Sequence, residues 1–163
     1  MATPAKPHSD DDPEVAPNRP STLDPLTHAE IQMLYRESTE TMRFVKNHQW
    51  KTVGATLLTY LGLVFIAGYV GHSASVGPKI MGVTIVLCCA VIFTLIIYQF
   101  WMHNELTKID RMQPHFSSAF AEIRAAKPRR EGNIHRYLLL SFMIVVVILG
   151  AVVVRVALDS LAR

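Results

Sequence analysis

Charged side chains are missing from three long stretches of this chain, residues 52–71, 80–102 and 138–158, apart from Arg155 in the third. Each stretch holds about twenty residues, enough at ~1.5 Å per residue to cross the ~30 Å hydrocarbon core of a bilayer. The alternation of polar and apolar residues that barrel strands need is missing as well. We therefore expect an all-α integral membrane protein with three transmembrane helices.

Catalytic motifs are the second absence. The sequence contains no nucleophile motif, P-loop or dinucleotide fingerprint. The first two spans hold none of the ionisable groups that a proton pathway needs. Cys88 and Cys89 are adjacent in an apolar block, which suits neither a disulfide framework nor a metal site. We expect a non-enzymatic protein with no catalytic residue, no cofactor and no bound metal.

One arrangement leaves a metal or haem site open as an alternative. Three histidines each lie two residues from an aromatic residue at the end of a span, namely His48, His103 and His135. Imidazole is a common ligand of transition metals and of haem iron. Histidine is also tolerated at a membrane interface without any ligand, and this is the interpretation that we favour.

A cleavable secretory signal is absent too, because residues 1–50 contain no apolar segment of the kind that precedes a cleavage site. Residues 1–26 are instead rich in proline and carry five acidic residues against two basic ones. Such a segment buries too little apolar surface to offset the entropy of ordering it. We expect it to be a disordered, acidic, Pro-rich cytoplasmic tail that the chain retains.

Ordered structure is expected to start with a helix over residues 27–51. Thr27 and Glu30 have the spacing of a capping box. No proline or glycine interrupts the sequence before Gly54, so one helix of about 44 residues, ~65 Å long, is predicted to continue from water into the first span. Its apolar residues fall close to one side, which we expect to be a cytoplasmic packing face: Ile31, Leu34, Tyr35, Met42 and Val45.

The remaining connections are either short or basic. Residues 72–79 contain Gly77-Pro78 and predict a short external turn, so that the first two spans form an antiparallel hairpin. Residues 103–137 predict a basic, helical cytoplasmic loop. In that loop the second span continues to Pro114, and a further helix runs over about 117–126. Residues 159–163 form the expected external C-terminal tail.

Lysine and arginine are distributed unevenly among these connections. Residues 27–51 hold four and residues 103–137 hold seven, whereas residues 72–79 and 159–163 hold one each. Cationic segments remain on the cytoplasmic side, so we expect the N-terminus inside and the C-terminus outside. An uncleaved chain with this orientation suits a bacterial inner (plasma) membrane. Three interfacial aromatic anchors mark the cytoplasmic ends of the spans: Trp50, Trp101 and Tyr137.

The densest cationic run lies just before the third span. We expect it to act as a topology signal and to contact anionic lipid, because each cation near an anionic leaflet contributes about 1 kcal/mol. No interleaved aromatic residues or folded nucleic-acid module accompany it, so we expect no nucleic-acid partner. The members of this lipid-facing patch are Lys127, Arg129, Arg130 and Arg136.

Two classes of function are left. The first is a scaffold or accessory subunit that packs its helices against the bilayer and against another copy or another membrane subunit. The second is a homo-oligomeric pore or channel. Over residues 30–125 the hairpin with polar helices at both ends resembles in outline the small two-span pore-forming effectors of bacterial defence systems, which implies oligomeric conduction. The third span departs from that pattern. The candidate pore-lining residues are Thr52, Thr56, Thr59 and Thr84.

Overall fold

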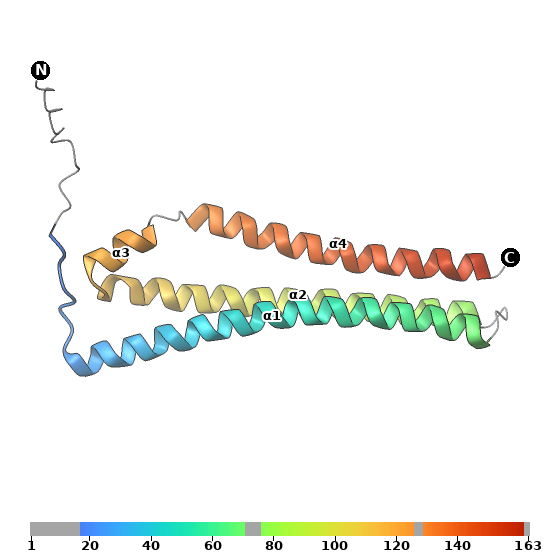
Figure 1. The fold of residues 1–163 in the computed structure, drawn as a ribbon, viewed down its shortest axis with the longest axis horizontal. Helices are drawn as coiled ribbons and strands as arrows, with labels where there is room; N and C mark the ends of the chain where they lie inside the picture. The colour runs from blue at the N-terminus through green and yellow to red at the C-terminus, as the bar shows by residue number, and fades with distance from the viewer. Residues whose placement is uncertain (1–16, 71–75, 126–128, 162–163) are drawn as a thin grey trace, which may run out of the picture.

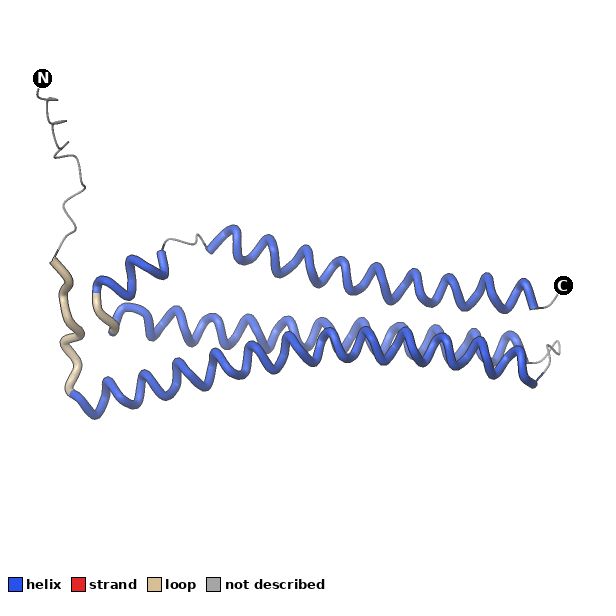
Figure 2. The backbone as a smooth tube through the Cα atoms, in the orientation of Figure 1, coloured by secondary structure: helices blue, strands red, loops and turns tan. Residues whose placement is uncertain are grey.

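The computed structural model describes residues 17–70, 76–125 and 129–161, and the side chains of all of these except 125 and 129–133. The described residues are mostly helical, with a loop over residues 17–24, and none of them forms a strand (Figure 2). Three of its helices are long and apolar enough to cross a membrane, which confirms the predicted all-α architecture with three candidate spans. Figure 1 shows the elements in order: α1 (Pro25–Val70), α2 (Val76–Met112), the 3-10 turn η1 (Gln113–His115), α3 (Ser118–Ala125) and α4 (Arg129–Leu161).

The start of α1 differs from the predicted capping box. The cap is Asp24, whose Oδ1 accepts hydrogen bonds from the amides of Leu26 and Thr27, each at 3.1 Å. Pro25 takes the first helical position, where its missing N–H is not needed and its fixed φ suits the helix. The Asp-Pro pair therefore places the cap three residues earlier than the Thr27 and Glu30 pattern predicts.

Removing this cap is expected to fray the first turn of α1. Hydrogen bonds from Thr27 hold the pKa of Asp24 below its ordinary value of 3.8, so the cap stabilises the helix start above that pH and is lost as pH falls through the folded pKa. Asp24→Ala should speed hydrogen exchange at the amides of residues 26–28, whereas Asp24→Asn, which keeps an acceptor oxygen, should not. Equal exchange in the two variants would contradict this role for the carboxylate.

α1 runs without interruption for 46 residues, about 69 Å, which confirms the predicted continuity between the polar helix and the first apolar stretch. Gly54 does not break it, because a Cβ at that position would meet open space and the helix needs no special conformation there. On the exposed side of α1, Arg36 and Glu40 form an ion pair one turn apart, with Nε and Oε1 3.0 Å from each other.

The three long helices form one antiparallel bundle (Figure 1). α1 and α2 lie side by side along most of their length, and α4 packs against both. One apolar cluster joins all three helices through Val53, Leu95 and Met143. A second cluster lies nearer the end that carries Val70 and Val76 and includes Tyr60, Ala67 and Val154. We call the opposite end, which carries α3, the head.

The buried positions follow the spacing of three and four residues that packs helices at shallow angles. In α1 this spacing continues far beyond the apolar stretch, through residues that are not all apolar: Ser38, Val45, Gln49, Val53, Thr56, Tyr60 and Ala67. In α2 the matching series passes through Leu95, Gln99, Glu105 and Ile109. The bundle is therefore one continuous helix–helix seam from its apolar end to the head.

This seam corrects the predicted packing face of residues 27–51. Val45 is fully buried, and Ile31, Tyr35 and Met42 are partly buried, but Leu34 is 48% exposed. Leu34 falls outside the seam because its neighbour Tyr35 occupies the inward position. The buried Ser38 and Gln49 take places that a search for apolar residues passes over.

The connection between α1 and α2 is shorter than predicted on its α2 side. Gly77 and Pro78 belong to the first turn of α2, where proline is well tolerated, and do not precede the helix. Residues 72–75 of the predicted 72–79 turn lie outside the described residues. The hairpin itself is as predicted, since the two helices run antiparallel and adjacent.

Candidate interaction site at the head of the bundle

The head is built where α2 ends and the chain folds back. α2 stops at Met112, and Pro114 lies in the η1 turn, as the sequence predicts. α3 then starts with Ser117 as its cap, because the Ser117 Oγ accepts a hydrogen bond from the Phe120 amide at 3.3 Å. The result is a short helix folded against the ends of α1 and α2 (Figure 1).

Tyr35 of α1 is the centre of an aromatic group in the head. Its ring makes edge contacts with Phe116 and Phe120, with centroids 5.7 Å apart in both cases. Phe116 also packs edge-on against His28, at 5.9 Å. These contacts join the first turns of α1 to the segment that follows α2. They account for the partial burial of Tyr35 and fix the position of α3 against α1.

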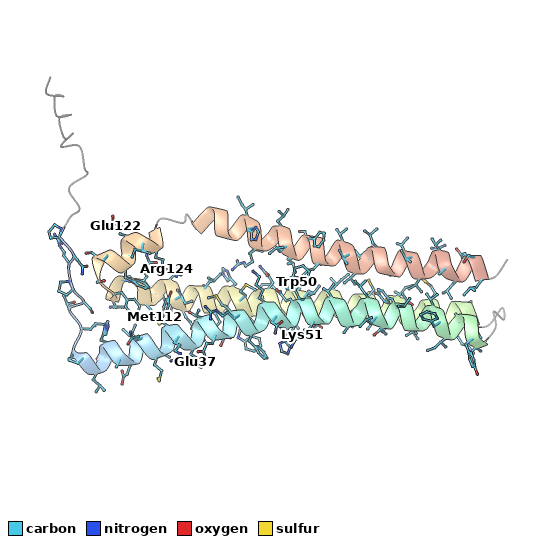
Figure 3. The ribbon with its side chains drawn as sticks, in the orientation of Figure 1. Glu37, Trp50, Lys51, Met112, Glu122 and Arg124 are labelled. Atoms are coloured by element: carbon cyan, nitrogen blue, oxygen red, sulfur yellow. The ribbon has the colours of Figure 1, made fainter. Side chains whose placement is uncertain are left out.

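Arg124 of α3 makes further contacts that hold this helix in place. The Arg124 Nη1 donates a hydrogen bond to the Tyr35 hydroxyl at 3.3 Å, and its Nη2 lies 3.9 Å from Asp110 of α2. One residue of α3 therefore contacts both long helices. Figure 3 shows Arg124 at this end of the molecule, with Met112 of α2 close by.

Residues 17–24 also belong to the head, although the sequence predicts a solvated tail through Leu26. The Ser118 amide donates to the Arg19 carbonyl at 3.1 Å, and the Arg19 amide donates to Ser118 Oγ at 2.8 Å. Asn18 Oδ1 accepts from the Ala119 amide, and the Ser21 hydroxyl donates to the His115 carbonyl. Hydrogen bonds to backbone groups hold this segment in place. Its low hydrophobicity therefore did not indicate that it would be ordered. Residues 1–16 lie outside the described part.

These elements line an open pocket of about 650 Å³ in the head. Its walls are the edge of the 17–25 segment, the first turns of α1 and the residues around Phe116 and Phe120. The apolar part of the wall is aromatic and proline-rich, while Gln32 and Ser21 supply polar groups. His28 faces the same space, and its Nδ1 is buried without a hydrogen-bond partner among the described residues. The pocket suits an apolar group that also carries a hydrogen-bonding atom.

Below the pocket, a buried carboxylate ties α2 to α1. Glu105 is 6% exposed, and Lys108 Nζ donates to its Oε1 at 2.8 Å. Burial opposes ionisation of Glu105, but hydrogen bonds from Lys108, Ser38 and Trp101 outweigh it and hold the pKa of Glu105 below its ordinary 4.5. A carboxylate inside a helical seam is stable only when its acceptors are filled in this way.

This linkage gives the head a testable dependence on pH. Because the folded pKa of Glu105 is lowered, its contribution is present above about pH 4.5 and is lost as pH falls further. Glu105→Gln should cost about 1 kcal/mol at pH 7 and should flatten the loss of stability between about pH 5 and pH 3. Glu122→Gln, at an exposed site on α3, should leave the pH profile as in the wild type. Thermal unfolding in detergent across this pH range measures both.

The side chains of the predicted interfacial anchors are about half-exposed in the structure. The exposed fractions of Trp50, Trp101 and Tyr137 are 44%, 42% and 51%. Of the predicted lipid-facing patch, Lys127 and the side chains of Arg129 and Arg130 lie outside the described residues. Arg136 is described and is partly buried, with its guanidinium 5.1 Å from the Tyr137 ring.

The histidine arrangement finds no metal geometry in the described part of the chain, where no three His, Cys, Asp or Glu side chains are grouped to hold an ion. His48 packs against Phe44 and Tyr98, and its Nδ1 lies 3.3 Å from the Phe44 carbonyl. His103 and His135 are exposed on other helices. Cys88 and Cys89 are free thiols, as predicted.

The threonines proposed to line a pore bond mainly to their own helices. The hydroxyls of Thr56, Thr59 and Thr84 donate to the carbonyls four residues earlier, at 2.7, 2.9 and 2.9 Å. Thr56 and Thr84 are buried in the seam and Thr59 is exposed. Their hydroxyl protons already form hydrogen bonds within the helix, so these side chains have no donor left for water or ions in a lumen.

In comparisons with known proteins, no family model, no curated protein and no solved structure matches this chain.

Proposed function

We propose that the chain is a non-enzymatic integral protein of the bacterial inner membrane, a scaffold or accessory subunit whose head faces the cytoplasm and binds a partner. The three long helices cross the bilayer, with the N-terminus inside and the C-terminus outside. The head and the polar half of α1 then project from the membrane as one packed unit.

Charge supports this orientation. The lysines and arginines are concentrated in residues 27–51 and 103–137, which the fold brings to the head, and few lie at the other end. Trp50, Trp101 and Tyr137 are half-exposed near the boundary between the apolar seam and the head, where amphipathic rings prefer the membrane surface.

The single observation that carries partner binding is the head pocket. Its walls come from three separate parts of the chain and are fixed by aromatic and backbone contacts, so the pocket is largely formed before anything enters it. An apolar or aromatic side chain of a protein partner would bury its surface there, and a polar atom beside it would meet His28 or Gln32.

Filling the pocket tests this proposal. Gln32→Trp places a large ring at the pocket wall, whereas Asn47→Trp adds the same ring at an exposed position of α1 outside the pocket. A stoichiometric partner should co-purify in mild detergent with wild type and Asn47→Trp, and should be lost with Gln32→Trp. A wild-type protein that purifies only as a free monomer, or a partner that ignores both variants, would contradict the proposal.

The pore alternative has its own measurement. The purified chain reconstituted in planar bilayers should show no unitary conductance if it is a scaffold. Unitary currents that disappear on substitution of Thr52 or Thr59 would instead establish the pore.

A further inference from the structure

Three buried donors without partners lie on three different helices of the bundle. Gln49 of α1 is 4% exposed and Gln99 of α2 is 7% exposed, and the Nε2 of each has no hydrogen-bond partner among the described residues. The Nε and Nη1 of Arg136 on α4 are likewise buried and unpartnered there. A buried donor without a partner destabilises the fold, so three such donors on neighbouring helices indicate a place for a hydrogen-bond acceptor.

The register of the bundle places the three donors at neighbouring levels of the seam. Val53, Leu95 and Leu140 pack in the same apolar cluster. Gln49 precedes Val53 by one helical turn, and Arg136 precedes Leu140 by one turn. Gln99 follows Leu95 by one turn. Because α2 runs antiparallel to α1 and α4, this step also leads toward the head. All three therefore lie on the head side of this cluster, at neighbouring levels. Gly150 packs beside Leu57 and Tyr60, so Arg136 lies about one turn nearer the head than Gln49. We call this stretch of the seam the donor layer.

The chemistry of the donor layer is that of an anion site. It supplies two carboxamide N–H₂ groups and a guanidinium, and these donate hydrogen bonds to phosphate oxygens. Among the described residues, three carboxylates form ion pairs, and each pairs with a cation other than Arg136: Glu40, Glu105 and Asp110. The structure therefore shows no counter-ion for Arg136 in its described part. A guanidinium with two buried nitrogens is strongly stabilised by an anion that reaches it.

The depth of the donor layer indicates where the anion comes from. Gln49 and Arg136 immediately precede Trp50 and Tyr137, and Gln99 lies two residues before Trp101. These aromatic residues face outward and are half-exposed. Figure 3 shows Trp50 near the middle of α1, where the three long helices run together. If these residues lie at the membrane surface, as the proposed function requires, the donor layer lies at the level of the lipid phosphates.

We propose that the donor layer of Gln49, Gln99 and Arg136 binds the phosphate of an anionic phospholipid, held between the helices on the cytoplasmic side. The proposal rests on the membrane orientation of the proposed function, and it extends the predicted lipid contact of Arg136 to a site built from all three long helices. Inorganic phosphate shares the chemistry of the headgroup, so the test separates the two sources.

The test uses the full-length chain in nanodiscs of phosphatidylcholine, with phosphatidylglycerol added in steps, and in a parallel arm with inorganic phosphate. Trp50 and Trp101 are the two tryptophans of the chain and flank the donor layer, so intrinsic fluorescence reports on it directly. We expect a saturable fluorescence change and a rise in melting temperature with phosphatidylglycerol, and neither with phosphate below millimolar concentration. Saturation by micromolar phosphate without lipid would overturn the lipid assignment.

The variants separate a built site from general surface charge. Arg136→Met keeps the length of the side chain and removes the donors, and should raise the lipid concentration at half-saturation at least about tenfold. Gln49→Leu and Gln99→Leu should each raise it severalfold. Arg111→Met removes an exposed cation from the end of α2 and should change it less than about twofold.

Stability without anionic lipid provides the second readout. If the donor layer only fixes the helix register, Arg136→Met should unfold more easily in pure phosphatidylcholine and show no loss specific to anionic lipid. If the layer is a site, the variant should be as stable as the wild type, or more so, in phosphatidylcholine, because an unpaired buried charge has been removed. Equal lipid responses of wild type and Arg136→Met would overturn the proposal. Partner co-purification that depends on Gln32 would still stand, so the two failures are distinguishable.

Discussion

Replacing Gly150 by valine is expected to lower the free energy of unfolding of the bundle by about 1–3 kcal/mol. Gly150 lies on α4 where that helix packs closely against α1. A Cβ at this position would come within 2.9 Å of both Leu57 Cδ2 and Tyr60 Cδ2. Leu57 is partly exposed and can move aside, but Tyr60 is 3% exposed and has no free space. The added side chain must therefore push α4 away from α1.

Alanine at the same position separates packing from helix propensity. Alanine is favoured over glycine within a helix by about 1 kcal/mol, so a glycine without close neighbours should give a stabilised variant. Gly62 and Gly68 are such positions, since a Cβ there meets nothing within 4 Å. Gly62→Ala is thus expected to be neutral or stabilising, and Gly150→Ala destabilising. Unfolding by SDS titration, followed by tryptophan fluorescence, measures the sign, and equal signs would contradict the close approach.

Tyr35→Ala is expected to release α3 from the bundle and to abolish binding at the head pocket. The substitution removes two edge-to-face ring pairs, each contributing about 0.5–1.5 kcal/mol, and the acceptor of the Arg124 hydrogen bond. The two ring pairs alone account for about 1–3 kcal/mol, and the lost hydrogen bond adds to this. That loss falls on a short helix that cannot persist without its tertiary contacts. Limited proteolysis and hydrogen exchange over residues 116–124 should show the release.

Two variants define which part of Tyr35 matters. Tyr35→Phe keeps both ring contacts and loses only the hydroxyl, so it should cost about 0.5–1.5 kcal/mol and leave α3 protected. Leu34→Ala truncates the adjacent residue, which is 48% exposed, and should change stability by less than about 0.5 kcal/mol. If Leu34→Ala exposed α3 as much as Tyr35→Ala, the assigned register of α1 would be wrong.

The long apolar stretches predicted the helices well because membrane insertion depends on the summed hydrophobicity of a segment. No individual residue decides it. The same reasoning failed for the head. Ser38, Gln49 and Glu105 are buried although they are polar, because their positions continue the seam spacing of Val45, Val53 and Ile109. Extending the spacing of three and four backward from the apolar stretch would have found them, and would have excluded Leu34.

The contacts of residues 17–24 were beyond the reach of sequence reasoning for a different reason. Asn18, Arg19 and Ser21 are held by hydrogen bonds to residues about a hundred positions later in the chain. No local pattern encodes such a partner, since serine and asparagine have the same composition signature in solvated tails and in clasped segments. The Asp24 cap, by contrast, was readable, because an aspartate before a proline at a helix start is a local signal.

Site-directed cysteine labelling in intact cells tests the membrane orientation most directly. In a background where Cys88 and Cys89 are serine, single cysteines replace Lys79 and Ser160 at the far end of the bundle and Ala119 in the head. An impermeant maleimide should label positions 79 and 160 from outside and reach position 119 only after permeabilisation. Labelling of positions 119 and 160 from the same side of the membrane would contradict three membrane crossings.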